Sequence, residues 1–295
     1  MMNARVIAPG LVACIIWVFC NISNKILFEQ GIAPLTVLLG QLLVSAPCLW
    51  IVVWMRRKPL PQTGMARLLR LGIWQPGIAY GTSLIGLSMT TVTVEALIFS
   101  TETLMIIFLA WVMLGERPGR KTIAAGVIGS IGVGLVAGLG SASTELSGYW
   151  GPALILVGTA AAALYSIFLR REVETIDPVS LIAIAQSGGL VTVAAMWILY
   201  PAAGGLANLS WQAMPLIAVS GVMMHSVGFV LFAKLLQKMD ASTASLLLLT
   251  IPVLTAVLGY AILDERLDAL QLCGAAIVLA AMLVEAWPIR RSKIA

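Results

Sequence analysis

Ten long apolar stretches, joined by short connections, constrain this chain more than any other feature of its sequence. They cover residues 7–28, 34–54, 68–88, 92–114, 122–140, 150–169, 178–200, 213–234, 241–263 and 270–288. Each stretch approaches the length of about 20 apolar residues that a helix needs to cross the hydrocarbon core of a membrane. The stretches are continuously apolar, whereas the strands of a membrane β-barrel alternate between polar and apolar residues. The sequence therefore predicts an all-α integral membrane protein with ten transmembrane helices.

The composition agrees with lipid as the surrounding solvent. Of the 295 residues, 60% are hydrophobic and only 11% are charged, whereas soluble domains contain about 25% charged residues. The formal net charge of +5 does not indicate nucleic-acid binding, because the cations are spread over several connections and form no basic face. We expect the lipid bilayer to be their partner, with no nucleic acid involved.

Lysine and arginine alternate between the two sides of the predicted helices. If the N-terminus is cytoplasmic, the inner regions hold Arg5, Arg56, Arg57, Lys58, Arg67, Arg70, Arg117, Arg120, Lys121, Arg170, Arg171, Lys234, Lys238, Arg290, Arg291 and Lys293. Of the 18 cations, only Lys25 and Arg266 fall on the outer side. This positive-inside bias predicts a multi-pass protein of the bacterial cytoplasmic membrane with both termini in the cytoplasm.

The sequence contains no pattern that is typical of a metal site or a cofactor site. Its four cysteines all fall inside predicted helices, and no CxxC motif or His/Cys cluster is present. We therefore expect no cofactor, no metal and no enzyme activity. An intramembrane enzyme is the alternative from another class, since two acidic residues within one helix could in principle perform acid–base chemistry.

The second half of the chain repeats the first half. Leu87–Glu116 aligns with Leu236–Glu265 at an offset of 149 residues. We assign residues 1–145 to a first five-helix repeat and residues 146–295 to a second one. Because five is an odd number, the two repeats would have opposite topology in the membrane. Inverted repeats of this kind are common in carriers that work by alternating access, and their substrates bind near the bilayer midplane.

The ends of the repeats also carry a family resemblance. Leu114-Gly115-Glu116-Arg117 and Leu263-Asp264-Glu265-Arg266 each close a predicted helix, and Pro252 lies about thirteen residues before the second motif. In these features the chain resembles the EamA-type carriers of the drug/metabolite transporter superfamily, and among them the bacterial exporters of aromatic amino acids. The resemblance implies that the first, third, fourth, sixth, eighth and ninth helices line a central cavity. The chain departs from the family pattern at Thr103, which takes the place equivalent to Pro252 and follows Glu102.

Two acidic residues lie in the predicted fourth helix. Glu95 and Glu102 are seven residues apart, which is almost two helical turns, so both side chains project from one face. Ionisable groups within a membrane are costly and mark functional sites by default. Either carboxyl group could bind a substrate ammonium or a proton. In the alternative interpretation, Glu95 reaches the outer surface and Glu102 forms a hydrogen bond to a neighbouring helix.

Further candidates for substrate binding lie in several predicted helices. They are Trp17, Asn21, Gln75, Tyr80, Ser83, Tyr165, His225 and Thr250. Trp17 could stack on an aromatic or cationic ligand. Pro76 predicts a kink beside Gln75, because proline cannot donate a helical hydrogen bond. His225, the only histidine, could contact the substrate or relay a proton, as could Glu102 and Glu95. Each of these residues could instead be a packing residue or a buried hydrogen-bonding group.

Together these features predict a membrane carrier that exports small organic solutes, in particular aromatic or large neutral amino acids. Aromatic and apolar side chains would accept the body of the solute, and a few polar groups would hold its charged head. A multidrug carrier for lipophilic cations would use the same cavity and the same acids. We expect a small-molecule substrate and a monomer or a weak dimer. Proton-coupled transport and facilitated diffusion both remain open.

Overall fold

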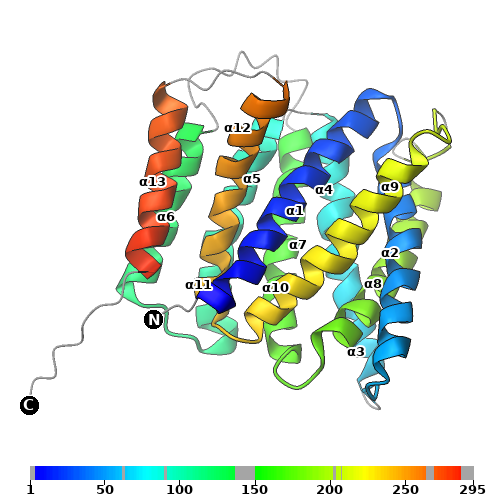
Figure 1. Cartoon of the computed structure of the whole chain (residues 1–295), viewed down its shortest axis with the longest axis horizontal. Coiled ribbons are helices and arrows are strands. Elements are labelled where there is room, and N and C mark those ends of the chain that lie inside the picture. Colours follow the sequence, from blue (N-terminus) through cyan, green and yellow to red (C-terminus); the bar gives the residue numbers. More distant parts are fainter. Residues whose placement is uncertain are drawn as a thin grey trace, which may run out of the picture.

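The computed structural model describes residues 4–61, 64–89, 92–136, 150–201, 204–206, 208–263 and 269–286, and within these ranges it forms a bundle of ten helical spans (Figure 1). Six spans are single helices: α1 (Ala4–Glu29), α2 (Pro34–Arg56), α6 (Arg120–Val136), α7 (Trp150–Glu172), α8 (Pro178–Leu199) and α13 (Ala269–Ala286). The fourth span is α5 (Val92–Leu109) with a π-helical turn (Ala110–Leu114). The predicted all-α architecture and its ten spans are confirmed.

The other three spans are each interrupted. The third consists of α3 (Met65–Gly72), a π-helical segment (Ile73–Ile78) and α4 (Ala79–Ser88). The eighth consists of α9 (Met214–Gly221), a π-helical segment (Val222–Gly228) and α10 (Phe229–Leu236). The ninth consists of α11 (Ala241–Ser245), a 3₁₀ segment (Leu246–Leu249) and α12 (Thr250–Leu263).

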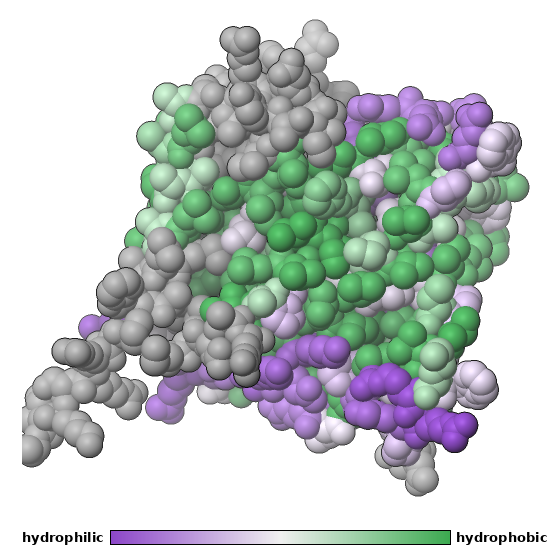
Figure 2. All heavy atoms as spheres, viewed as in Figure 1, coloured by the Kyte–Doolittle hydropathy of each residue, from purple (hydrophilic) through white to green (hydrophobic). Residues whose placement is uncertain are grey.

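The helices have the length and the surface of membrane spans. Among the described residues, five are long and apolar enough to cross a membrane: Val6–Glu29, Pro34–Arg56, Trp150–Glu172, Pro178–Leu199 and Met214–Leu236. Shorter apolar helices cover Ile98–Leu114, Ala241–Thr255 and Leu272–Ala281. Figure 2 shows a broad apolar zone across the bundle, with hydrophilic residues at its lower edge and at the upper right. Glu265, Arg266, Arg290, Arg291 and Lys293, on which part of the sequence argument rests, lie outside the described residues.

The predicted kink at Pro76 is confirmed. Gln75 has extended backbone angles (φ −150°, ψ 124°) in the middle of the third span, which is the conformation favoured for a residue that precedes proline. The kink lies against α7 and α8. It therefore turns the side chain of Gln75 toward the middle of the bundle.

Pro252 has a related effect in the ninth span. Proline cannot donate the usual hydrogen bond and its ring clashes with the preceding turn, and the residues just before it, Leu246–Leu249, form a tighter 3₁₀ turn. Thr103 Oγ1 donates to the Ser245 carbonyl oxygen at 3.1 Å. The residue that stands at the proline-equivalent position of the fourth span is thus bonded to the broken part of the ninth.

Two pairs of helices hold the bundle together at close range. α6 packs along α13 at one edge (Figure 1), where a Cβ added to Gly132 would lie 2.9 Å from the Gly274 carbonyl oxygen. Between α3 and α8, a Cβ on Gly72 would overlap backbone atoms of Ala185 and Gly189. Only residues without side chains allow such approach.

Ion pairs join the C-terminal end of α2 to the N-terminus of α8. Asp177 caps the N-terminus of α8 by accepting hydrogen bonds from the backbone N–H groups of Val179 and Ser180 at 3.2 and 3.3 Å. Arg56 and Lys58, at the end of α2, reach its carboxylate at 2.9 and 2.8 Å. Burial raises the pKa of Asp177, but the bonds from Lys58 and Ser180 and the charge of Arg56 outweigh it and leave the pKa below its usual range.

Gly72→Ala should destabilise the protein. The added methyl group would overlap backbone atoms of α8, which cannot move aside as a flexible side chain can. We expect a loss of about 1–3 kcal/mol, as for overpacked cores, measured by thermal unfolding of the purified protein in detergent. Gly119→Ala is the matched control, since its nearest neighbour within 4 Å would be Thr122 Oγ1 at 3.9 Å. Equal stability of the two variants would contradict the close approach of α3 and α8.

Candidate functional site

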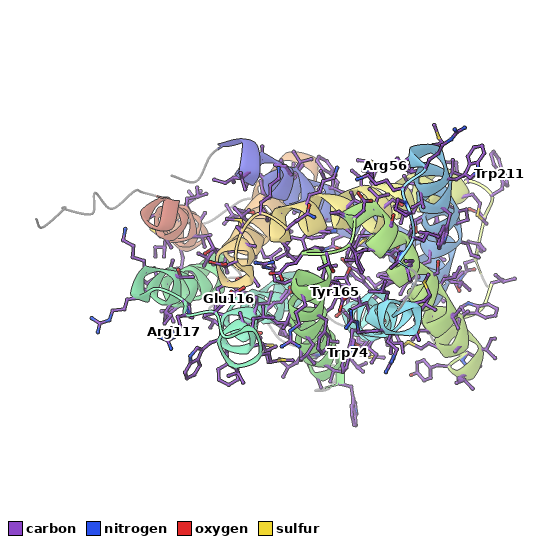
Figure 3. All side chains as sticks on the ribbon, turned by 90° about the horizontal axis from the view of Figure 1, so that it is seen from below. Arg56, Trp74, Glu116, Arg117, Tyr165 and Trp211 are labelled. Carbon is purple, nitrogen blue, oxygen red and sulfur yellow. The ribbon has the colours of Figure 1, made fainter. Side chains whose placement is uncertain are left out.

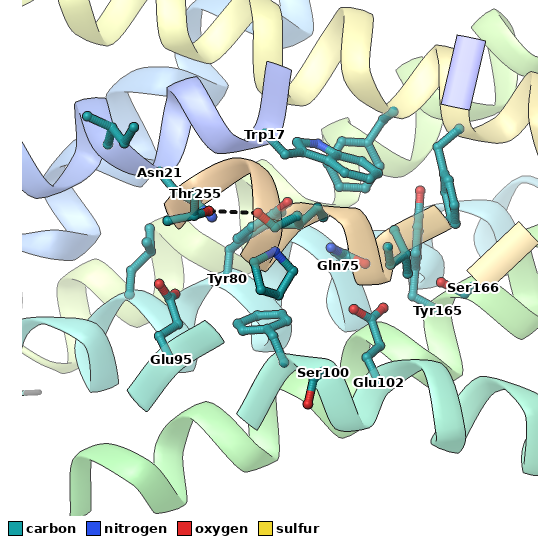
Figure 4. A pocket seen from close by; sticks show the side chains of 18 residues that line it. Trp17, Asn21, Gln75, Tyr80, Glu95, Ser100, Glu102, Tyr165, Ser166 and Thr255 are labelled. Carbon is teal, nitrogen blue, oxygen red and sulfur yellow. Dashed lines mark hydrogen bonds between the residues drawn. The ribbon is translucent and has the colours of Figure 1, made fainter. Parts of the chain in front are cut away.

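A cavity lies in the middle of the bundle (Figure 4). Its 18 lining residues come from the first, third, fourth, sixth, eighth and ninth spans, the same six that the resemblance implies. The kinked third span and the broken ninth span contribute Gln75 and Pro252 to the wall. These two interruptions therefore border the cavity, where freed backbone groups are tolerated.

The cavity brings together most of the residues that the sequence singled out. Trp17, Asn21, Gln75, Tyr80, Glu95, Glu102 and Tyr165 all line it, whereas Ser83, His225 and Thr250 do not. For all of these residues, the role in substrate binding stays a prediction.

His225 lies behind the cavity wall. It is fully buried, and its Nε2 is 3.3 Å from Gln41 Oε1. Because an amide oxygen only accepts, Nε2 must be the protonated nitrogen in this bond. The ring stacks on Phe229 (centroids 6.1 Å apart, 12° between planes) and meets Tyr80 edge-on at 5.3 Å. In this position His225 supports two residues of the wall.

Ser83 and Thr250 also lie outside the cavity lining. Thr250 Oγ1 donates to the Leu247 carbonyl oxygen at 2.6 Å, in the 3₁₀ segment of the same span. Ser83 is buried against α7, so close to Gly158 that a Cβ there would overlap its hydroxyl group. Helical spacing alone could not distinguish these faces from the cavity face.

The two acids of α5 point to the same side, as their spacing predicts (Figure 4). Glu95 is buried and Glu102 is partly buried. Lys25 is near enough to Glu95 to attract it electrostatically, but the ion pairs found among the described residues involve neither acid. A carboxylate in such a place can bind a proton or an organic cation.

Aromatic rings form another part of the wall. Trp17 meets Phe229 and Phe232 edge-on, with centroids 5.7 and 5.5 Å apart. Tyr165 meets Phe229 at 5.8 Å. The sequence analysis missed Phe229 and Phe232, because a phenylalanine in an apolar run does not stand out from its neighbours. The repeat alignment could have identified Phe229, since it lies 149 residues after Tyr80 and is therefore its equivalent in the second repeat.

Glu116 ties three of the lining spans at one end. Its carboxylate accepts hydrogen bonds from the N–H groups of Ala241 and Ser242 at 3.0 and 3.2 Å and from the Ser242 hydroxyl at 3.0 Å. Arg170 Nε, at the end of α7, is 3.9 Å from Glu116 Oε1. Figure 3, which views the molecule from below, shows Glu116 among these helix ends.

Glu116→Gln should therefore lower stability. The amide keeps the shape but has only one oxygen for the two N–H groups and no charge for Arg170. We expect a loss of about 1 kcal/mol, the usual value of a helix N-cap, measured by thermal unfolding in detergent. Glu174→Gln is the control, since within the described residues this exposed side chain forms an (i, i+4) pair with Arg170 and no other ion pair, and such a pair is worth about 0.3–0.5 kcal/mol. Matching losses would argue against a special role for Glu116.

Three proteins are similar to this chain over most of their length. The uncharacterized transporter YcbK of Bacillus subtilis (strain 168) is 24% identical, over 92% of this chain and 90% of its own. The uncharacterized transporter YoaV of the same organism is 21% identical, over 95% and 96%. An uncharacterized transporter of Archaeoglobus fulgidus is 24% identical, over 79% and 82%.

A crystal structure of another protein shares the fold. It matches with a TM-score of 0.81 over 96% of this chain and 98% of that chain, at 14% sequence identity. At such low identity the likeness shows the fold alone. The EamA-like transporter family matches the sequence twice, over residues 5–138 and 149–285.

Proposed function

The chain belongs to the EamA-like transporter family, and on that premise we propose that it exports small organic solutes, in particular aromatic or large neutral amino acids. It is a multi-pass membrane transporter rather than an enzyme. The observation that carries the proposal is the cavity itself, in which the carboxylate of Glu102 shares one space with aromatic rings.

The proposed binding mode follows from the two kinds of wall. Glu102 attracts the ammonium group of the solute, and Gln75 offers amide donors and an acceptor in the same cavity. The rings of Trp17, Tyr165 and Phe229 accept an aromatic or large apolar side chain, because ring edges and faces attract each other.

We further propose that the cavity is exposed alternately to the two sides by rocking of two inverted repeats, residues 1–145 and 146–295. The two π-helical segments support this relation, because Val222 follows Ile73 by the same 149 residues that align the repeat sequences. Packing supports it too: the third span lies against the sixth, and the first lies against the eighth. A carrier built in this way binds its solute where the repeats meet.

The cations support a cytoplasmic location for one end of the bundle. Arg56 and Lys58 pair with Asp177, and Arg67 pairs with Glu172 at 2.8 Å. Because these contacts join helix ends that carry positive charge in the sequence pattern, we place this end and both termini on the cytoplasmic side of the bacterial inner membrane. The lipid bilayer and the solute are the proposed partners, with a monomer or a weak dimer as the working unit.

Efflux of lipophilic cations is the second candidate. It is favoured by the lining, in which Glu95 and Glu102 are the charged residues and neither lysine nor arginine appears among the described positions. A lipophilic cation has no carboxylate, so its binding site does not need a lysine or an arginine in the wall.

Counterflow in proteoliposomes tests the function. Vesicles loaded with unlabelled amino acids should accumulate labelled phenylalanine, and phenylalanine, tryptophan and tyrosine should compete best. Competition by lipophilic cations but not by amino acids would favour the second candidate. If uptake did not saturate and showed no counterflow, the protein would be a pore instead of a carrier.

Glu102→Gln should reduce counterflow by roughly tenfold or more, because a hydrogen bond to a charged group is worth about 1.5–3 kcal/mol. The change keeps the size of the side chain and removes its charge. Glu174→Gln, an exposed residue distant from the lining, is the control and should retain transport. Unchanged uptake and unchanged pH dependence in Glu102→Gln would leave Glu102 as a structural residue only.

A further inference from the structure

Tyr165 carries a hydroxyl group that the folded chain does not use. The residue is 1% exposed and lines the cavity. Its hydroxyl oxygen is buried and has no hydrogen-bond partner among the described residues. Leaving a buried hydroxyl unpaired costs about 1–3 kcal/mol, and buried tyrosines usually find a partner. A phenylalanine would fill the same space without this cost.

Trp17 carries a second donor without a partner among the described residues. It is 8% exposed, it lines the cavity, and its indole Nε1–H also lacks a partner within the described part of the chain. Both rings meet Phe229 edge-on, at 5.7 Å for Trp17 and 5.8 Å for Tyr165. Trp17 Nε1 lies against Gly228 of the eighth span, where an added Cβ would be 2.9 Å from it, so the Tyr165 hydroxyl is the donor left for a solute.

Polar groups line the same cavity as Tyr165. They include the carboxyl group of Glu102, the amide group of Gln75 and the hydroxyl group of Tyr80. An acid that can hold an ammonium group and a donor that can hold an oxygen thus share one cavity. An α-amino acid carries both of its charged groups on a single carbon atom and needs this combination.

We propose that the Tyr165 hydroxyl is a specificity-determining donor to a carboxylate oxygen of the solute and selects amino acids over amines with the same side chain. The inference rests on the proposed function and extends it, because a carrier of lipophilic cations would have no use for this donor. It also explains why the wall needs no lysine or arginine, since neutral donors can bind a carboxylate.

The test compares two competitors in the counterflow assay. Phenylalanine and phenethylamine have the same ring and ammonium group, and only phenylalanine has a carboxylate. Tyr165→Phe should weaken competition by phenylalanine by roughly tenfold, the value of a lost hydrogen bond to a charged group. Competition by phenethylamine should stay unchanged, so the ratio between the two compounds is the quantity to measure.

Thermal unfolding without solute gives an independent readout. Tyr165→Phe should be at least as stable as the original protein, because it removes an unpaired buried group. Thr159→Val is the matched control: its buried hydroxyl lies on the same helix as Tyr165, donates to the Ile155 carbonyl oxygen at 2.8 Å and lies outside the lining. That variant should keep the original discrimination between phenylalanine and phenethylamine.

Two results would overturn the inference alone: an equal loss for both competitors, or a clear drop in the stability of Tyr165→Phe without solute, which would mean that the hydroxyl is paired inside the protein. Counterflow of phenylalanine by the original protein would still stand in both cases. Absence of counterflow with every amino acid would overturn the proposed function, and the inference with it.

Discussion

The structure depends on one constraint, which is that every backbone N–H and C=O group within hydrocarbon needs a hydrogen-bond partner. Helices satisfy it, and interruptions are tolerated only where they face the protein interior. The kink at Gln75 and the 3₁₀ turn before Pro252 both border the cavity. The breaks that would be costly against lipid are thus the places where the wall of the cavity is formed.

The same constraint separates two kinds of acidic residue. Asp177 and Glu116 lie at helix ends, where backbone N–H groups and cations satisfy them. Glu95 and Glu102 lie within the fourth span and line the cavity without an ion pair among the described residues. The first kind fixes the ends of the bundle, whereas the second kind is available to a solute or a proton.

The helices could be predicted closely because length and hydropathy decide them. The predicted span 178–200 is Pro178–Leu199 in the structure, and 34–54 is Pro34–Arg56. Acids and polar aromatics in the cavity were found because they are rare in apolar spans. Phe229 was missed because phenylalanine is common in apolar spans. His225 is rare too, but its bond to Gln41 comes from packing between distant helices, which no local pattern contains.

The proposed repeat relation explains why the cavity has two different walls. Positions 149 residues apart pair Tyr80 with Phe229 and Glu102 with Ile251, and all four residues line the cavity. In each pair the first half supplies the polar group and the second half an apolar one. Two halves with identical side chains would enclose a uniform cavity, suited to a uniformly polar or apolar solute. Divergence at these two pairs instead places polar groups and apolar groups in one cavity, which matches a solute that has a charged head and an apolar body.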